Sequence, residues 1–387
     1  MARGKLLAVV CFLALVASTG AALACPFCSA VSQTFSEEMA TMDAVVIAEL
    51  VQPPPPSKPD DAGKELPKAK FKVTRVVKGD SLVKQDQMIE TIYFGDATKG
   101  KPFLIMGVDP QNLMWSTPLL LTDRAKQYIP QLLTLPKEGA GRLEFFQEYL
   151  EDHDEMLARD AYDEFAKAPY AAVIELKPKM KHDQLVAWIQ NPDVPASRRR
   201  LYLTMLGVCG SGQDVPMLAD MLKSSDRKAK AGLDALIACY LTLQGPGGLE
   251  LVEDLYLKNE KSEYADTYAA IMAIRFHGSE TTVVPKERLV QSLRYMLDRP
   301  QLADLVIPDL ARWEDWEVMP KMVELFKTAD EKSSWVRVPV VNYLRACPKP
   351  EAKDAIAQLE KIDPAAVKRA NTFFPFGGGA PAPTAKN

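Results

Sequence analysis

Two closely spaced cysteines are the residues best placed for chemistry. They stand in the sequence Cys25-Pro-Phe-Cys28, close to the start of the chain. A Cys-x-x-Cys pair can close a local disulfide, and it can exchange disulfides where a helix N-terminus lowers the pKa of the first thiol. No strand precedes this pair to position such a helix, and Ser29 stands where covalent haem attachment needs a histidine. We therefore expect a disulfide, either between Cys25 and Cys28 or to another chain, and we keep thiol–disulfide activity as an alternative.

The segment ahead of the cysteines has the pattern of a secretory signal peptide, residues 1–24. A positively charged start is followed by an apolar run at 6–16, and small residues stand at Ala22 and Ala24. We predict cleavage between Ala24 and Cys25, an exposed mature N-terminus, and a secreted or periplasmic location. The apolar run is shorter than the ~20 residues that a membrane-spanning helix needs. Lipidation of Cys25 is the alternative, and it is the one route by which we expect membrane attachment.

Composition excludes several function classes. The chain of 387 residues is 47% hydrophobic and 25% charged, which is typical of a globular protein. Its net charge of −4 gives no reason to expect nucleic acid as a partner. Only three histidines are present, and the sequence has no phosphate-binding loop, no His-Glu-x-x-His zinc motif and no nucleophile elbow. We therefore expect no catalytic residues, no metal and no cofactor.

Residues 25–121 have the pattern of a small β-domain. Apolar and alternating runs predict five closely spaced strands, at 43–51, 70–77, 87–94, 101–108 and 113–121. A proline- and charge-rich insert at 53–68 is expected to be a solvated loop. Five such strands favour a closed barrel, because closure leaves no exposed sheet edge.

A short helix with a capping box is expected between the cysteines and the first strand. Thr34 is followed three residues later by Glu37, the Thr-x-x-Glu pattern of a helix start. The order of N-terminal cysteines, short helix and strands resembles the netrin-like module, the OB-type barrel of the tissue inhibitors of metalloproteinases. That resemblance implies that the free α-amino group and carbonyl of Cys25 bind the catalytic zinc of a target enzyme. The family also ties its N-terminal cysteines to later barrel cysteines, whereas this chain has none between Cys28 and Cys209.

From residue 122 the apolar period changes from that of strands to that of helices. Apolar residues three and four apart predict a helical linker region, 122–194, packed on a solenoid at 195–364. The solenoid segment contains pairs of predicted helices, and their turns are marked by Gly210, Gly245, Gly278, Asp315 and Lys349. The spacings of these markers are 35, 33, 37 and 34 residues. Helix pairs at this period resemble degenerate HEAT or armadillo-like repeats, and the resemblance implies an α-solenoid with a protein-binding surface.

Three tryptophans near one ridge of the predicted solenoid are candidate binding residues. Trp313, Trp316 and Trp335 could form an exposed apolar patch, although aromatic residues at helical spacing more often pack in a core. The basic run at 198–200 has a simpler interpretation. It is expected to be a helix start that pairs with nearby acids.

The remaining cysteines inside the helical segment have no evident chemical role. Cys209 and Cys239 stand at similar places in successive repeats. We expect them to be buried free thiols that pack as small apolar groups, with a disulfide between repeats as the alternative.

Together these patterns predict an α+β multidomain protein. A small N-terminal OB-like β-barrel precedes an all-α HEAT-like solenoid, and residues 365–387 form a flexible tail. The predicted function is non-catalytic, namely binding or scaffolding of an extracytoplasmic protein partner through the solenoid surface. Two alternatives remain open. One is docking on a metalloenzyme through Cys25, and the other is thiol–disulfide activity through Cys25 and Cys28.

Overall fold

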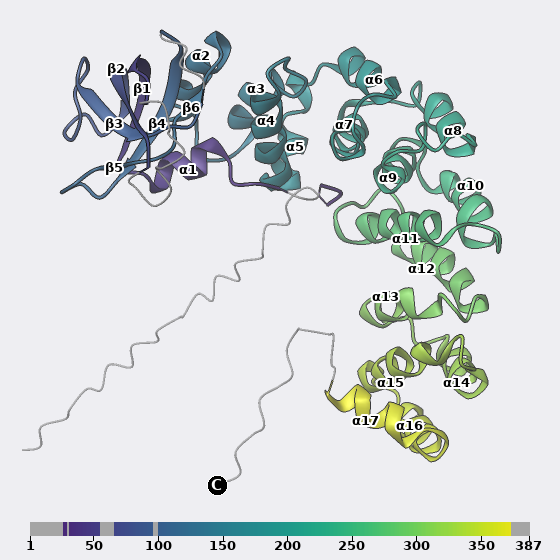
Figure 1. Cartoon of the computed structure of the whole chain (residues 1–387). Helices are drawn as coiled ribbons and strands as arrows, with labels where there is room; N and C mark the ends of the chain where they lie inside the picture. The colour runs from purple at the N-terminus through teal and green to yellow at the C-terminus, as the bar shows by residue number, and fades with distance from the viewer. Residues whose placement is uncertain (1–25, 29–30, 55–65, 96–99, 373–387) are drawn as a thin grey trace, which may run out of the picture.

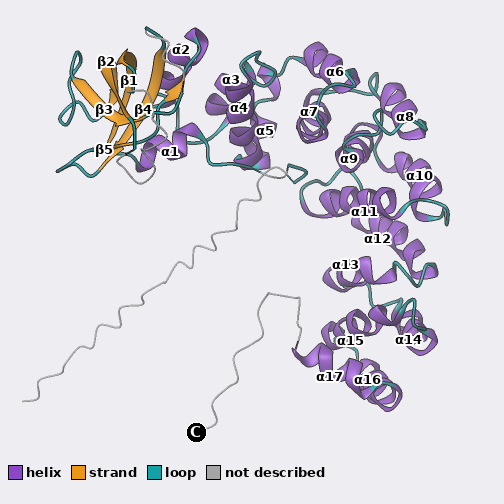
Figure 2. Cartoon of the chain, in the orientation of Figure 1, coloured by secondary structure: helices purple, strands orange, loops and turns teal. Residues whose placement is uncertain are grey.

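The computed structural model describes residues 26–28, 31–54, 66–95 and 100–372. A strand-rich unit comes first, and helices then follow one another along a curved path (Figure 1, Figure 2). The fold is therefore α+β, as the sequence predicts. The predicted signal peptide and its cleavage site between Ala24 and Cys25 lie outside the described residues.

Helix α1 (Phe35–Thr41) begins at the predicted capping box. The Thr34 side chain accepts a hydrogen bond from the Glu37 N–H at 3.3 Å, and the Glu37 carboxylate accepts one from the Thr34 N–H at 3.0 Å. These bonds satisfy N–H groups that have no partner inside the helix. At the other end, the Lys78 ammonium donates to the carbonyl of Met39 at 2.8 Å and holds the helix against the sheet.

The β-domain is built on one antiparallel sheet. Its strands are β1 (Ala44–Gln52), β2 (Lys68–Lys78), β3 (Met88–Ile92), β4 (Pro102–Val108), β5 (Met114–Trp115) and β6 (Leu119–Leu120). Hydrogen bonding orders them β3-β2-β1-β4-β5, and β6 also pairs with β4. The first four predicted strands are confirmed, whereas the fifth is divided into β5 and β6. Pro118 has no N–H to donate to a ladder, so the chain leaves the sheet there.

The sheet curves into a nearly closed barrel. The Thr91 hydroxyl of β3 donates to the carbonyl of Ser116, next to β5, at 3.0 Å. This side-chain bond links the two end strands of the path, where no backbone ladder joins them. Inside, the rings of Phe71, Tyr93 and Phe103 pack edge to face with centroids 5.4 to 5.7 Å apart.

Strand β1 is buried on both of its faces. Val46 and Ala48 belong to the core inside the barrel. Val45 and Ile47, which point the other way, belong to a second core shared with the helices. Helices α1 and α2 (Asp123–Leu132) pack on this outer face of the sheet, since Met39 of α1 and Ile129 of α2 share its core. The core of the helical half therefore begins on the barrel itself, and this continuity ties the two parts together.

Helices make up the described chain after the barrel. The first of them are α3 (Ala140–Gln147), α4 (Glu155–Lys167), α5 (Tyr170–Glu175) and α6 (His182–Gln190). Five pairs follow: α7 (Ala196–Cys209) and α8 (Val215–Lys223), α9 (Leu233–Gln244) and α10 (Leu249–Val252), α11 (Tyr264–Ser279) and α12 (Lys286–Arg294), α13 (Ile307–Arg312) and α14 (Met319–Thr328), α15 (Arg337–Ala346) and α16 (Glu351–Ile362). A π-helical turn, η4 (Glu253–Leu257), extends α10, and a short 3-10 helix, η7 (Ser334–Val336), precedes α15. No described helix is both long and apolar enough to cross a membrane.

The predicted helix pairs are confirmed. Four of the turn markers lie between the two helices of a pair, and Gly278 lies in the last turn of α11. The first helices of successive pairs contact one another, α7 with α9, α9 with α11 and α13 with α15. They follow the inner side of the curve, while the second helices follow the outer side (Figure 1). We call these two sets the inner layer and the outer layer.

Helix α17 (Pro364–Thr372) corrects the expected start of the tail at 365–387. Ala366 is fully buried there, and its N–H donates to the Asp363 carboxylate at 2.9 Å. Proline suits a first helical position, because its fixed φ is already helical and the missing N–H would have no partner. The rest of the predicted tail, 373–387, lies outside the described residues.

Candidate functional site

The segment Pro26–Cys28 lies against the helical half of the molecule. Phe27 is only 5% exposed, and the side chains around it come from α5, α7, α9 and α11. We expected the Cys25-Pro-Phe-Cys28 motif to be exposed at the mature N-terminus, and for Phe27 this is wrong. The physical reason is that an apolar ring gains free energy by leaving water, and the inner layer offers it a place.

The site that receives the ring has a floor of small residues and an aromatic rim. We name it the Phe27 socket, and its lining is Tyr170, Leu203, Thr204, Gly207, Ala235, Ala238, Cys239, Thr242 and Phe276. A Cβ on Gly207 would lie 3.7 Å from the Cα of Cys239, so α7 and α9 approach closely there. The ring centroids of Phe27 and Phe276 are 5.0 Å apart, and those of Phe276 and Tyr170 are 5.3 Å apart. A free volume of about 10 Å³ remains, so the phenylalanine ring fills the socket.

Opposing free energies of similar size act on the docked segment. Burying a phenylalanine side chain contributes about 1.5–3 kcal/mol, and an aromatic pair adds about 0.5–1.5 kcal/mol. Fixing the backbone costs about 1–2 kcal/mol per residue. For Pro26–Cys28 these contributions nearly cancel, although proline and a disulfide both restrict the undocked segment and so reduce the cost of ordering it. The docked and undocked states are therefore close in free energy.

The cysteines near the socket are in different states. Cys28 is disulfide-bonded, and its partner lies outside the described residues, since the other described cysteines (Cys209, Cys239 and Cys347) are free thiols. Pairing with Cys25 therefore stays a prediction. Both Cys209 and Cys239 are free thiols as expected, although only Cys239 is fully buried and Cys209 is half-buried. Burial raises the pKa of both, that of Cys239 well above its ordinary value. Protonated thiols are poor nucleophiles, so Cys239 adds no reactive group to the socket.

A buried histidine lies directly behind the socket floor. The Nε2 atom of His277 lies 3.1 Å from the carbonyl oxygen of Ala238, and Nδ1 lies 3.0 Å from the hydroxyl of Thr281. A carbonyl only accepts, so Nε2 carries the proton and Nδ1 accepts from the hydroxyl. Burial lowers the pKa of His277 to about 4. The ring is therefore neutral near pH 7, and it acts as a fixed hydrogen-bonding strut between α9 and α11.

The three tryptophans do not form one patch. Trp313 and Trp316 are half-buried, and they line a hollow of about 360 Å³ between α12 and the α13–α14 turn, which we name the tryptophan hollow. The ring of Trp316 also packs on Tyr343 at 5.2 Å. Trp335 lies in η7, is 48% exposed, and donates from Nε1 to the carbonyl of Gln301 at 3.2 Å. Two of the three candidate residues thus share a surface, and the third belongs to another one.

The turn that shapes the tryptophan hollow is strained. Glu314 has a positive φ of 60°, a conformation that favours glycine. The Asp315 N–H donates to the Leu310 carbonyl at 2.9 Å, the bond that ends a helix in a Schellman motif. Arg294 donates to both carboxylate oxygens of Asp315 and, at 2.7 Å, to Glu317. Much of the charge around the hollow is therefore paired within the protein.

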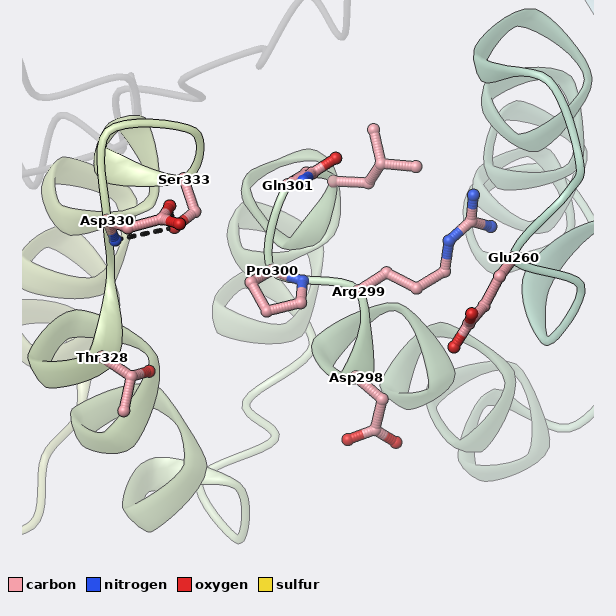
Figure 3. A pocket seen from close by; sticks show the side chains of 9 residues that line it. Glu260, Asp298, Arg299, Pro300, Gln301, Thr328, Asp330 and Ser333 are labelled. Atoms are coloured by element: carbon pink, nitrogen blue, oxygen red, sulfur yellow. Dashed lines mark hydrogen bonds between the residues drawn. The ribbon is translucent and has the colours of Figure 1, made fainter.

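A larger pocket, of about 430 Å³, opens between the connections that follow α12 and α14 (Figure 3). Its lining is Glu260, Asp298, Arg299, Pro300, Gln301, Leu302, Thr328, Asp330 and Ser333. Arg299 donates to the carbonyl of Tyr256 at 3.1 Å, and the Ser333 hydroxyl donates to Asp330 at 2.7 Å. The three carboxylates lie apart from one another around the opening. Across the described residues, no cluster of three or more side chains could hold a metal ion.

A buried carboxylate joins the β-domain to the helices and so positions the start of the chain. Asp160 of α4 accepts a hydrogen bond from the Tyr128 hydroxyl of α2 at 2.6 Å, and another from the N–H of Phe35 at 2.7 Å. Burial raises the pKa of Asp160 to about 6 in spite of these bonds. Lys167 pairs with Glu37 beside it. Helix α1 is thereby attached to α4, and the chain that leads back to Phe27 starts from a defined place.

Ion pairs connect successive inner-layer helices at the predicted period. Arg200 in α7 pairs with Asp234 in α9 at 2.7 Å, and Arg275 in α11 pairs with Asp309 in α13 at 2.7 Å. Both pairs span 34 residues, which is one of the marker spacings found in the sequence. Arg198 pairs with two acids near the start of α4, so the structural interpretation of the basic run is confirmed.

Sequence reasoning missed the residues that receive Phe27. The sequence assigned no site role to Tyr170 or Phe276, because nothing local links either residue to Phe27. The one local signal is the set of small residues at Gly207, Ala235 and Ala238, which marks a close helix contact and leaves the identity of the occupant open.

Comparison with known proteins does not assign the chain to a family. No family model matches the chain, and a search of curated proteins finds no relative. The likeness to netrin-like and HEAT-like proteins therefore rests on residue patterns, together with a nearly closed barrel and a helical C-terminal half.

Proposed function

We propose that this protein is a non-catalytic extracytoplasmic binding or scaffolding protein, and that its helix pairs form a HEAT-like α-solenoid that binds a protein partner. The observation that carries the proposal is the docking of Pro26–Cys28 on the inner layer. A surface of stacked helices that already accepts one protein segment has the shape and apolar character to accept another. Nucleic acid is not proposed as a partner, because the chain is acidic overall.

The proposed location is secreted or periplasmic after removal of residues 1–24, with a lipid anchor on Cys25 as the alternative. The intact mass of the mature protein decides between them. A free α-amino group on Cys25 supports a soluble form, whereas an added diacylglyceryl mass makes the protein membrane-tethered.

The two alternative functions both depend on the cysteines on either side of Pro26 and the buried Phe27. Docking of Cys25 on the zinc of a metalloenzyme, implied by the netrin-like resemblance, needs an accessible N-terminus. Thiol–disulfide exchange by Cys25 and Cys28 needs an accessible disulfide. Burial of Phe27 anchors the segment Pro26–Cys28 on α9 and α11, and neither alternative accounts for this contact.

Site-specific photo-crosslinking tests the proposed function. One variant carries a photo-reactive amino acid at Thr242, beside the socket in the inner layer. A matched variant carries it at Glu250, which is exposed on α10 in the outer layer. We expect one defined extracytoplasmic protein to be crosslinked from position 242, to be absent from position 250, and to be displaced by unlabelled protein. Crosslinking that is equal at both positions, or absent from both, would contradict the proposal.

A further inference from the structure

We infer that the Phe27 socket is an interaction site for a protein segment that presents a phenylalanine on a turn, and that Pro26–Cys28 is its exchangeable intramolecular occupant. The inference rests on the proposed function, and it names the surface and the kind of partner. Three properties of the socket lead to it.

The first property is that the polar groups of the socket floor already have hydrogen-bond partners within the protein. The Thr204 hydroxyl donates to the carbonyl of Arg200 at 2.8 Å, and the Thr242 hydroxyl donates to the carbonyl of Ala238 at 2.8 Å. Both hydroxyls are thus satisfied by their own helices. The thiol of Cys239 is kept neutral by burial. No polar group on the floor therefore needs a ligand, and the socket selects an apolar side chain.

The second property is its size and its rim. The phenylalanine ring leaves a free volume of only about 10 Å³ beside it, so a side chain of this size matches the socket. The ring of Phe276 meets Phe27 at an interplanar angle of 52°, a tilted contact that an aliphatic side chain cannot reproduce. The anchor that matches the socket is therefore a phenylalanine.

The third property is that the socket walls are built without the segment. Helix α9 contacts both α7 and α11 directly, and the pair of His277 with the carbonyl of Ala238 fixes α11 against α9 behind the floor. An empty socket therefore keeps its shape. Because burial of Phe27 and ordering of its neighbours nearly balance, a partner with the same anchor and additional contacts displaces the segment.

The test uses the purified full chain and a synthetic probe. The probe is a fluorescein-labelled, disulfide-closed peptide with the sequence of residues 25–34, and its binding is followed by fluorescence anisotropy. We expect Phe27→Ala to bind the peptide more tightly than the wild type, by about two- to tenfold, because its socket is always empty whereas that of the wild type is only partly free. Phe94→Ala is the matched control, since Phe94 is exposed on the β-domain, and it should behave as the wild type. A peptide with alanine in place of phenylalanine should bind neither protein.

Equal affinity of the wild type and Phe27→Ala for the peptide would overturn the inference. A second measurement uses the native fold, so that a folding defect of the variant cannot decide the result. With 4-fluorophenylalanine at position 27 alone, an excess of unlabelled peptide should move the fluorine resonance to its solvent-exposed position. A resonance that stays unchanged at millimolar peptide would show that Pro26–Cys28 does not leave the socket, and it would refute the proposed exchange.

The outcomes separate the inference from the proposed function. A partner that crosslinks at position 242 of the wild type and of Phe27→Ala with equal yield keeps the scaffold function and refutes the socket as its site. Peptide exchange without any crosslinked partner supports the socket and refutes the proposed protein-binding function. Higher crosslinking in Phe27→Ala, blocked by the peptide, supports both.

Discussion

The β-domain and the helical half are held together in different ways. The barrel depends on contacts between segments far apart in its sequence, such as the bond from Thr91 to Ser116 and the cluster of Phe71, Tyr93 and Phe103. The helical half adds one pair to the next, and its contacts seldom reach beyond the neighbouring pair. A closed barrel leaves few strand edges with unpaired backbone groups. Stacked helix pairs, in contrast, leave an inner surface open along the whole length of the stack. The open half is therefore the one with room for a partner, and it is where Phe27 lies.

The largest expected effect comes from removing an aromatic ring from each half. Phe71→Ala in the barrel and Phe326→Ala in α14 both empty fully buried sites, and each should cost about 3–5 kcal/mol of unfolding free energy. The two variants should differ in how far the destabilisation spreads along the chain. Hydrogen exchange should accelerate across all of β1–β4 in the first variant, but only across α13–α16 in the second. Faster exchange in α7 of Phe326→Ala would show that the helical half unfolds as one unit.

The next effect concerns two buried titratable groups, one at the junction with the barrel and one inside the helical half. The native pKa of Asp160, about 6, lies above its ordinary value of 3.8. Ionisation of Asp160 therefore costs the native state about 3 kcal/mol at pH 7, and this cost is lost progressively as pH falls from about 6 to 3.8. The native pKa of His277, about 4, lies below its ordinary 6.5, so the native state loses about 3 kcal/mol as pH falls from 6.5 through 4. The two effects oppose each other.

Urea unfolding of two variants at pH 4 and pH 7 separates these contributions. Relative to the wild type, Asp160→Asn should gain about 2 kcal/mol of unfolding free energy between pH 4 and pH 7, because it lacks the ionisation cost. His277→Gln should lose about 3 kcal/mol over the same rise, because it lacks a base that protonates on unfolding. Changes of the same sign in both variants would contradict the burial that distinguishes the two groups.

A smaller effect is expected where a glycine supports the tryptophan hollow. A Cβ at position 278 would lie 2.2 Å from Cζ2 of Trp313, so Gly278→Ala should push the indole aside and cost about 1–3 kcal/mol. Gly212→Ala is the matched control, since nothing lies within 4 Å of its added Cβ. Thermal unfolding and tryptophan fluorescence report both changes. An unshifted fluorescence spectrum in Gly278→Ala would mean that the hollow adapts without moving Trp313.

The smallest effect is a gain in stability. Glu314→Gly relieves a left-handed conformation and should raise the unfolding free energy by about 1 kcal/mol or less, because glycine also loses more backbone entropy on folding. Glu314→Ala keeps the strain and should give no gain. Chemical denaturation measures both variants. A loss of stability in Glu314→Gly would assign a stabilising contact to the glutamate side chain.

Helices and strands that depend on neighbouring residues could be predicted from the sequence. Where their side chains lie in the folded molecule could not. The capping box at Thr34 and the helix pairs follow from short-range rules, so both appear where the sequence places them. The fifth strand was predicted as continuous because its apolar content outweighed Pro118. The tryptophans were grouped because they are close in sequence, yet a turn within a pair and a connection between pairs separate Trp313 from Trp335.

The sequence by itself determined the class of each half, the period of the helix pairs and the scarcity of groups for catalysis. These properties depend on residue spacing and composition, which local backbone geometry converts directly into strands and helices. Only the tertiary structure decided that Phe27 is buried and that Tyr170 and Phe276 surround it. That contact joins residues far apart in the chain, and its free energy depends on a socket that exists only after α7, α9 and α11 have packed together.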